Sequence, residues 1–240
     1  MLVRVEHLLP HATSADVQAQ KPTVAVLPIG SFEQHGAFHP LVTDTVIACA
    51  IAKRIAEDYA LFLLPPVTMS LSHEHAGFPG SVSIRATTLV AIVSDVVESL
   101  RSSGIRHVVL VNGHGGNYVL QNVVQEANVA DRQMTLFPLP VDWNRARADS
   151  SMETDSHEDM HAGELETSIL LHVAPELLRA GYDNTDWRAD DRKFLLMKGM
   201  SEYTQSGVIG FPSLGTAEKG KRTLESLSES FKHHLEALIG

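Results

Sequence analysis

The chain has 240 residues, of which 44% are hydrophobic and 20% are charged, and its formal net charge at pH 7 is -10. This length and composition are those of a soluble α/β protein, and no linker divides the chain, so we expect a single domain over residues 1–240. The acidic balance excludes a nucleic-acid partner, because affinity for phosphates comes largely from lysine and arginine. Without a membrane-length apolar run or a signal-peptide pattern, we expect a cytoplasmic protein with no membrane partner.

Buried strands and amphipathic helices alternate along the sequence. Strands are predicted at 24–29, 61–67, 108–111 and 134–139, and two prolines place the second at an edge or end it early. Helices are predicted at about 43–58, 87–103, 118–130, 164–174 and 220–239. This alternation predicts an α/β fold with a mostly parallel sheet. Residues 141–159 form a polar stretch. The irregular segment 182–212 is typical of a lid, an interface or disorder, and the sequence does not choose among them.

The loop after the first predicted strand carries Glu33 and His35. In α/β proteins the loops beyond the carboxyl ends of the strands hold the chemistry. Side chains two residues apart in an extended segment point to the same side, so this carboxylate and this imidazole can meet at one point. A metal ion is the expected occupant.

Asp44 lies near the start of the next predicted helix, on the same face as Ile47, Ile51 and Ile55. One interpretation is a helix N-cap, a position that aspartate favours. The other is an inward carboxylate close to the Glu33 loop, which we favour because Thr43 is available as the cap. Asp44 is then a candidate bridging ligand.

His114 follows the third predicted strand within the sequence N-G-H-G-G-N, residues 112–117. The glycines could form a tight turn that points the imidazole inward, or a phosphate cradle. The dinucleotide-binding pattern requires glycine where Tyr118 stands, so a metal-bound or catalytic His114 is the better interpretation. The backbone N–H groups of Gly115 and Gly116 could also bind a developing oxyanion.

Glu166 shares a helix face with Ile169, Leu170 and Val173, which predicts a carboxylate turned toward the core. Glu164 lies on a more polar face and is expected to remain in water. Since a buried unpaired carboxylate is costly, Glu166 must be protonated, paired or bound to a metal.

Three residues are candidates for contacts with a substrate. His73 and His75 flank a glutamate in the loop after the second strand, where they could face a site or lie in solvent. Trp143, after the fourth strand, could line a pocket or simply pack.

Two histidines and three carboxylates make up the candidate ligand set, which is Glu33, His35, Asp44, His114 and Glu166. Each of two ions could take one histidine and one terminal carboxylate and share Asp44, and this nitrogen and oxygen set suits Zn²⁺, Mn²⁺ or Fe²⁺. Two ions about 3.5–4 Å apart can hold a bridging hydroxide and polarise a carbonyl oxygen. His161, just ahead of Glu166, could then pass a proton to the leaving nitrogen.

Other chemistries have less support. The chain has no G-x-S-x-G motif, and its single cysteine, Cys49, lies among small apolar residues that predict a packed thiol. A metal-binding module without catalysis remains as a rival, in which the same ligands hold a structural ion or a small effector. A proton-transfer residue such as His161 would be superfluous there.

Four motifs, in order along residues 24–225, resemble the creatininase (creatinine amidohydrolase) family: G-S-F-E-Q-H-G at 30–36 with T-D at 43–44, F-P-G-S at 78–81, N-G-H-G-G-N at 112–117 and H-A-G-E-L-E-T-S at 161–168. The resemblance implies a three-layer α/β/α domain, two divalent metals and hydrolysis of a non-peptide or cyclic C–N amide bond in a small molecule. It also implies a homo-oligomer, often a hexamer. Carried over by motif, Glu33, His35, Asp44 and His114 match metal ligands, and His161 matches the catalytic base.

The departures from the family pattern bear on the substrate. Where this chain has His114, Gly115 and Gly116, creatininase has a His-aromatic-Glu triplet. The glutamate of that triplet is a metal ligand, which Gly116 cannot replace. We therefore expect Glu166 to be the substitute ligand. Trp143 matches one pocket tryptophan of creatininase, but a second falls at His157, so creatinine is not the expected substrate. Relatives with the Gly-Gly form hydrolyse formamides or trim a short modified peptide in redox-cofactor maturation, and both activities remain open.

Overall fold

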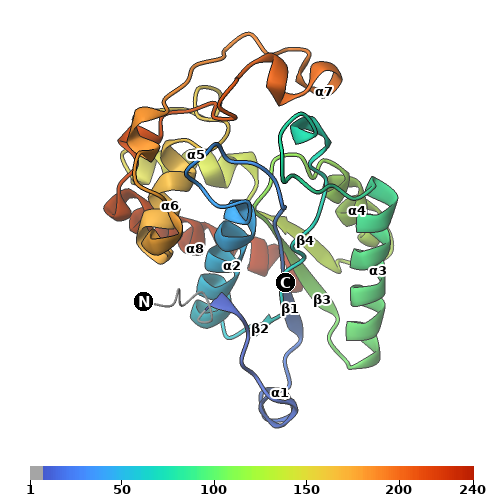
Figure 1. Cartoon of the computed structure of the whole chain (residues 1–240). Helices are drawn as coiled ribbons and strands as arrows, with labels where there is room; N and C mark the ends of the chain where they lie inside the picture. The colour runs from blue at the N-terminus through green and yellow to red at the C-terminus, as the bar shows by residue number, and fades with distance from the viewer. Residues whose placement is uncertain (1–7) are drawn as a thin grey trace.

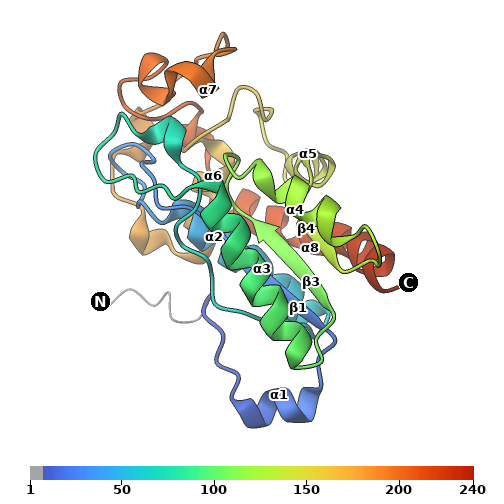
Figure 2. The same cartoon turned by 90° about the vertical axis from the view of Figure 1, so that its right-hand side faces the viewer.

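The structure is a computed structural model that describes residues 8–240 (Figure 1). Its middle layer is a sheet of four parallel strands in the order β2-β1-β3-β4, with β1 at Val24–Ile29, β2 at Phe62–Leu63, β3 at His107–Asn112 and β4 at Met134–Phe137. On one face pack α2 (Thr43–Asp58), α5 (Pro140–Asp149), α6 (Glu164–Val173) and α8 (Ala217–Ile239). The other face is covered by α3 (Ala86–Ser102) and α4 (Val119–Ala127), as Figure 2 shows. The predicted three-layer α/β/α fold with a parallel sheet is confirmed.

The two central strands are buried on both faces because successive side chains alternate between them. Val24 and Val26 of β1 lie in the core beneath α2 and α8, whereas Ala25 and Leu27 lie in the core beneath α3 and α4. The four central residues of β3 alternate in the same way. This two-sided burial explains why both strands are continuous apolar runs in the sequence.

Three helices were not predicted, namely α1 (Ser14–Gln20), α5 and the four-residue α7 (Leu195–Lys198) within the segment expected to be irregular. The short α1 begins with a capping box between Thr13 and Asp16. The helix α5 occupies the first half of the predicted polar stretch, and its N-terminal Leu139 N–H donates to Asp142 at 2.8 Å. Its apolar positions have no strong helical periodicity because much of its surface is exposed. The predicted strand 61–67 shrinks to the two residues of β2, which is an edge strand as expected.

The carboxyl ends of β1 and β3 lie side by side, since Ile29 pairs with Asn112. The loops that follow these strands therefore leave from the same edge of the sheet. The segment 182–212 arches over this edge and contains the short helix α7 (Leu195–Lys198) at the top of Figure 1. Within it, Gly210 pairs with Trp187, and Ile209 pairs with His161.

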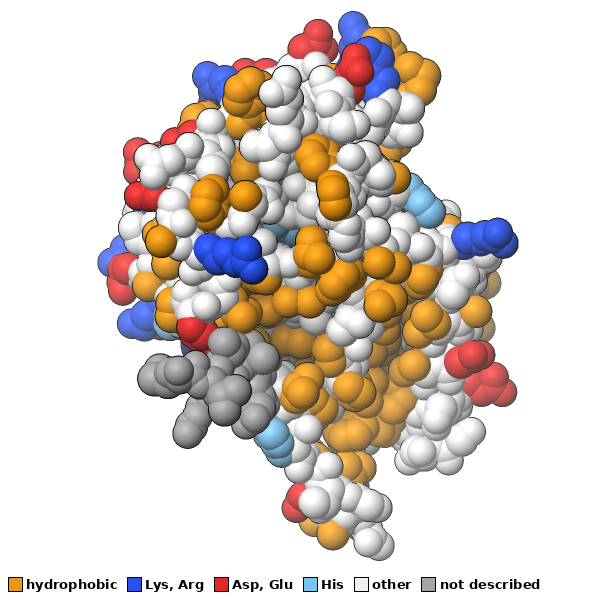
Figure 3. Space-filling model, in the orientation of Figure 1, with side chains coloured by type: hydrophobic (Ala, Val, Ile, Leu, Met, Phe, Trp, Pro, Cys, Tyr) orange, Lys and Arg blue, Asp and Glu red, His pale blue; other side chains and the backbone are white. Residues whose placement is uncertain are grey.

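The face of the molecule seen in Figure 3 carries a broad apolar area. In Figure 3, hydrophobic side chains gather on the face between the β2 edge of the sheet and α3. Partly exposed apolar residues of this region include Leu64, Val67 and Ile84. Within residues 8–240, no helix has the length and apolar character needed to cross a membrane.

Phe231 of α8 tests the packing of the core beneath α2 and α8. It is fully buried, and its ring lies 5.1 Å from the ring of Phe137 and 5.3 Å from that of Tyr59. We expect Phe231→Ala to lower the free energy of unfolding by about 3–5 kcal/mol, because it removes buried surface and leaves a cavity. In the control Leu196→Ala, whose side chain is 77% exposed in α7, the change should stay within about 0.5 kcal/mol. Urea unfolding curves measure both, and equal losses would contradict this description of the core.

Candidate metal centre

Histidines and carboxylates from four segments meet at the carboxyl edge of the sheet. Glu33 and His35 come from the loop after β1, Asp44 from the first turn of α2, His114 from the loop after β3 and Glu166 from α6. The first four side chains are buried, and Glu166 is half-buried. All five predicted ligands thus lie together in one cluster.

Two glycines let α2 begin this close to the strands. A Cβ on Gly30 would lie 2.4 Å from the Cα of Thr45, and a Cβ on Gly113 would lie 2.4 Å from the carbonyl oxygen of Asp44. A larger residue at either position would push the first turn of α2, and with it Asp44, away from the strand ends. Thr43 is not the N-cap as predicted: Val42 holds that position, and the Thr43 hydroxyl donates to the Pro40 carbonyl at 2.7 Å.

His114 presents a lone pair to two carboxylates. Its Nε2 lies 2.6 Å from the carbonyl oxygen of Leu71, and because a carbonyl only accepts, this nitrogen carries the proton. In the neutral ring Nδ1 is then unprotonated, although it lies 2.9 Å from Asp44 Oδ2 and 3.3 Å from Glu33 Oε1. That arrangement is repulsive unless a proton or a metal ion lies between the groups.

His35 repeats the arrangement. Its Nδ1 donates to the carbonyl oxygen of Glu33 at 3.1 Å, and its Nε2 lies 3.0 Å from Asp44 Oδ1 and 3.7 Å from Glu166 Oε2. A histidine that donates one ring N–H to a backbone carbonyl and turns its other nitrogen toward carboxylates has the geometry typical of a metal ligand.

The charges of the cluster depend strongly on one another. Burial lowers the pKa of His35, but Asp44, Glu166 and Glu33 outweigh it and raise the pKa to about 10. For His114, burial again acts downward, and Glu33 and Asp44 raise the pKa well above its usual value. Burial raises the pKa of Asp44, yet the two histidines hold it well below the ordinary range. A divalent cation can take the place of the protons that the histidines would otherwise carry.

Glu33 provides a separate reason to expect a cation. Both of its carboxylate oxygens are buried, and neither accepts a hydrogen bond within the described part of the chain. A buried carboxylate without partners costs several kcal/mol or more, so such groups normally bind a metal or a donor. Possible ligand atoms lie within 4.8 Å of one another in three groups, which are Glu33, Asp44 and His114; His35, Asp44 and Glu166; and Glu33, His35 and His161. The first two groups share Asp44, and their donors fit two divalent ions.

The two glutamates of α6 differ from the prediction. Glu164, expected in water, is fully buried, accepts from the Thr154 hydroxyl at 2.6 Å and pairs with Lys219 at 2.5 Å. Glu166 is the more exposed of the two: its side chain is 16% exposed, and its Oε2 accepts from the Ala162 N–H at 2.6 Å. The prediction from helix periodicity was wrong for Glu164 because its partner is Lys219 of α8. The periodicity of α6 alone cannot reveal a partner on another helix. Burial raises the pKa of Glu166 to about 7. His35 acts to lower it, and Asp44 acts to raise it.

Asp159 fixes the first turn of α6, which carries Glu166. Its carboxylate accepts from the N–H groups of Glu164 at 2.5 Å and Leu165 at 3.0 Å, and Arg147 of α5 donates to it at 3.1 Å. Sequence reasoning did not identify Asp159 or Arg147 as supporting residues. An aspartate just ahead of a predicted helix was an available signal, whereas the arginine partner was not.

His161 is held as a neutral base beside the cluster. Its Nε2 donates to the carbonyl oxygen of Gln34 at 2.6 Å, which leaves Nδ1 unprotonated at 3.8 Å from Glu33 Oε1. Burial, followed by the nearby rings of His35 and His75, holds the pKa of His161 well below its usual value. The ring is therefore neutral, with its unprotonated Nδ1 beside the centre.

The three candidate substrate contacts separate in space. Trp143 lines a cavity of about 350 Å³ together with His114 and Glu166, so it lies beside the cluster. His73 is exposed and lines a second cavity on the far side of the His114 loop. His75 is buried within the cluster, where its Nε2 lies 3.2 Å from Glu33 Oε1.

The glycines after His114 have different surroundings. A Cβ on Gly116 would lie 2.4 Å from Glu74 Oε1 and 2.4 Å from His114 Nε2, so Glu74 fills the space that a side chain would need. A Cβ on Gly115 would meet nothing within 4 Å. Glu74 was not predicted as part of the site, and burial raises its pKa.

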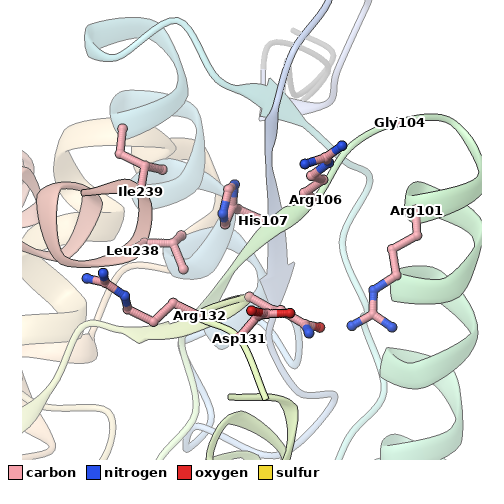
Figure 4. Close-up of a pocket in the computed structure, with 9 residues that line it drawn as sticks. Arg101, Gly104, Arg106, His107, Asp131, Arg132, Leu238 and Ile239 are labelled. Atoms are coloured by element: carbon pink, nitrogen blue, oxygen red, sulfur yellow. The ribbon is translucent and has the colours of Figure 1, made fainter. Parts of the chain in front are cut away.

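A larger cavity, of about 730 Å³, lies at the opposite edge of the sheet (Figure 4). Arg101, Arg106 and Arg132 line it, but their guanidinium groups point in different directions. Arg132 donates to the carbonyl oxygen of Ala237 in the last turn of α8, a normal role for a cation at a helix C-terminus. None of the predicted site residues lies there.

The family model described as "Creatininase: Creatinine amidohydrolase" matches residues 10–235. The chain belongs to the creatininase family. A mycofactocin precursor peptide peptidase from Mycolicibacterium smegmatis is 33% identical over 221 residues, which cover 88% of this chain and 83% of that protein. A creatinine amidohydrolase from Pseudomonas putida is 26% identical over 174 residues, which cover 65% of this chain and 66% of that protein.

Among solved structures, "Creatininase Mn" matches the fold with a TM-score of 0.81 at 22% identity, covering 96% of this chain and 98% of that chain. At this identity the likeness concerns the fold, which agrees with the parallel sheet and its two helical layers. The curated relatives carry the names of hydrolases, so the creatininase family to which this chain belongs is a family of hydrolases.

His39 joins the loop of Glu33 and His35 to α6, since its Nε2 lies 2.8 Å from the Thr167 hydroxyl. Burial, and to a lesser degree His35, lower the pKa of His39 to about 3, below the ordinary 6.5. The unfolded chain therefore binds this proton more readily, so the stability from the neutral ring is complete above pH 6.5 and decreases as the pH falls toward 3. Between pH 6.5 and about 5, we expect the unfolding free energy of the wild type to fall more steeply than that of His39→Gln. Urea titrations across this range measure the slopes, and parallel slopes would contradict the prediction.

Proposed function

We propose that the chain is an amidohydrolase that binds two divalent ions through Glu33, His35, Asp44, His114 and Glu166. The observation that carries the proposal is the position of Asp44, whose two oxygens face His35 and His114 at 3.0 and 2.9 Å. A donor set of nitrogen and oxygen without thiolate suits Zn²⁺, Mn²⁺ or Fe²⁺. When bound, such a pair of ions polarises an amide carbonyl and lowers the pKa of water.

The surrounding residues have roles that follow from their positions. His161, neutral and with Nδ1 free to accept, takes a proton from the attacking water and returns it to the leaving nitrogen. The N–H groups of Gly115 and Gly116 donate to no backbone carbonyl within residues 8–240, which leaves them available to a developing oxyanion. Trp143 forms part of the wall of the cavity beside Glu166.

The substrate is an amide that fits the cavity of about 350 Å³ beside His114, a volume at the low end for ligand sites. Small cyclic amides and formamides have this size. A second candidate activity is the trimming of a short modified peptide, which the M. smegmatis relative favours through its name and its 33% identity over most of both chains. Both activities break a C–N bond with the same residues, and they differ in what must occupy the cavity.

We also propose that the protein assembles as a homo-oligomer. The apolar area along the β2 edge is suited to a subunit contact, because an open sheet edge is rarely left both apolar and uncovered. A hexamer is the form implied by the family resemblance.

Metal content tests the bridged centre. We expect about two ions per chain in the wild type, and one or fewer in Asp44→Asn. Asp44 belongs to both proposed ligand groups, and asparagine does not carry its negative charge. Elemental analysis of purified protein measures this, with circular dichroism to show that the fold is retained. The matched control is Asp95→Asn, an exposed aspartate of α3, which should keep both ions. Equal metal content in all three proteins would make Asp44 a structural residue.

The role of His161 separates an enzyme from a binding module. We expect His161→Gln to retain its metal but to lose about 10²–10⁴ in the rate of amide hydrolysis, since proton transfer is impaired. Amine release from a panel of formamides, cyclic amides and short peptides measures the rate. The control His233→Gln alters a histidine of α8 whose side chain is 77% exposed and should act as the wild type. Absence of any activity in the wild type across this panel, with metal bound, would favour the non-catalytic module.

A further inference from the structure

We propose that Gln34 and His75 form a positioning pair, in which the Gln34 amide sets the tautomer of His75 so that a ring N–H holds the carboxylate of Glu33. The inference rests on the proposed metal centre, to which Glu33 would contribute. Neither Gln34 nor His75 is proposed to touch a metal or the substrate.

The first step is the orientation of the Gln34 amide. This side chain is buried, and its Oε1 accepts from the backbone N–H of Gly36 at 2.9 Å. A backbone N–H can only donate, so the atom facing it must be the amide oxygen. The NH₂ group of Gln34 is therefore the end that points toward the histidines.

The second step is the count of acceptors around this NH₂ group. Its nitrogen lies 3.0 Å from the carbonyl oxygen of Gly207, 3.0 Å from His75 Nδ1 and 3.2 Å from His161 Nε2. His161 Nε2 already donates to the backbone carbonyl oxygen of Gln34 at 2.6 Å, so this nitrogen carries a proton and cannot accept one from the Gln34 amide. The two amide hydrogens therefore go to Gly207 and to His75 Nδ1.

The third step fixes the proton of His75. Because Nδ1 accepts from Gln34, the neutral ring carries its proton on Nε2. That nitrogen lies 3.2 Å from Glu33 Oε1, although the two atoms are not aligned for a hydrogen bond in this structure. The other two ring nitrogens near this oxygen, Nδ1 of His114 at 3.3 Å and Nδ1 of His161 at 3.8 Å, are unprotonated in the neutral rings. When the rings of His114 and His161 are neutral, as they would be with a metal ion bound, His75 is thus the neighbour that can offer a donor to Glu33.

Glu33 needs such a donor, since both of its oxygens are buried and accept no aligned hydrogen bond in the described chain. A ligand carboxylate that is also held by a donor keeps one orientation, and loss of such a supporting group typically costs 10–100-fold in metal affinity. Gln34 is itself held by the 182–212 segment, because its NH₂ group donates to the Gly207 carbonyl oxygen at 3.0 Å. Gly207, with φ +90°, also leaves room for the Gln34 side chain, since a Cβ there would lie 1.7 Å from Gln34 Oε1. This segment therefore contributes to the centre through Gln34.

The test compares variants of His75 in the full-length protein. Leucine cannot donate, whereas the amide nitrogen of glutamine can lie close to the position of histidine Nε2. Titration of each protein with Zn²⁺ against a competing chelator measures two affinities. We expect His75→Leu to weaken one ion about 10–100-fold while the other binds nearly as in the wild type, because Glu33 lies in only one of the two ligand groups that share Asp44. We expect His75→Gln to restore most of the loss, and His233→Leu to have no effect.

A purely structural role for His75 gives a different result, since a weakened fold would reduce both affinities together and glutamine would not restore them. Unchanged affinities in a folded His75→Leu, or an equal loss of both ions, would overturn the positioning pair. If the wild type itself binds no divalent ion, the proposed function fails, and this inference fails with it. Two ions in the wild type with unaltered binding in the variant would overturn only the pair.

The tautomer can be measured without relying on any variant to bind metal. In the metal-free wild type labelled with ¹⁵N-histidine, we expect the His75 signals of a ring protonated on Nε2 and unprotonated on Nδ1. The spectrum of His75→Gln assigns them by their loss. A His75 ring protonated on Nδ1 would contradict the hydrogen bond from Gln34 and overturn the proposal.

Discussion

The structure depends on burying three chemically different groups, carboxylates, imidazoles and backbone carbonyls, around one point at the edge of the sheet. Glu33 and Asp44 are buried with His35 and His114, and each histidine has its outer nitrogen bound to a backbone carbonyl. The inner nitrogens have only carboxylates to face. The electrostatic cost of this arrangement is low only when a positive charge lies in the middle.

The fold meets this requirement through close approach of the backbone. Parallel strands place the ends of β1 and β3 together, and glycine at the end of each strand admits the first turn of α2 between them. Asp44 then faces both histidines at once. If β1 and β3 were not neighbours, or if a side chain at position 30 or 113 displaced α2, the same residues would lie too far apart to share an ion.

Hydrogen bonds from neighbouring residues orient the groups that surround the centre. Asp159 and Arg147 fix the turn that carries Glu166, and Gln34 contacts two histidines and the carbonyl oxygen of Gly207 in the 182–212 segment. The loop after His114 differs from these supports, because Glu74 fills the space beside Gly116 and excludes any side chain there. Position 116 is thus closed to a larger residue, and Glu166 is the carboxylate of α6 that lies near His35, at 3.7 Å.

The sequence by itself determined the layered α/β fold and which residues could be ligands. Strands buried on both faces must be continuous apolar runs, and polar residues directly after such runs must lie at one edge of a parallel sheet. Those relations are local, so Glu33, His35, Asp44 and His114 could be identified without coordinates. Only the tertiary structure decided how α5 forms, why Glu164 is buried while Glu166 is partly exposed, and where His75 lies. Each of these depends on a partner distant in sequence: Lys219 for Glu164, and Gln34 with Glu33 for His75. The protonated nitrogen of each histidine is likewise set by a particular carbonyl or amide, and no periodicity within a single element carries that information.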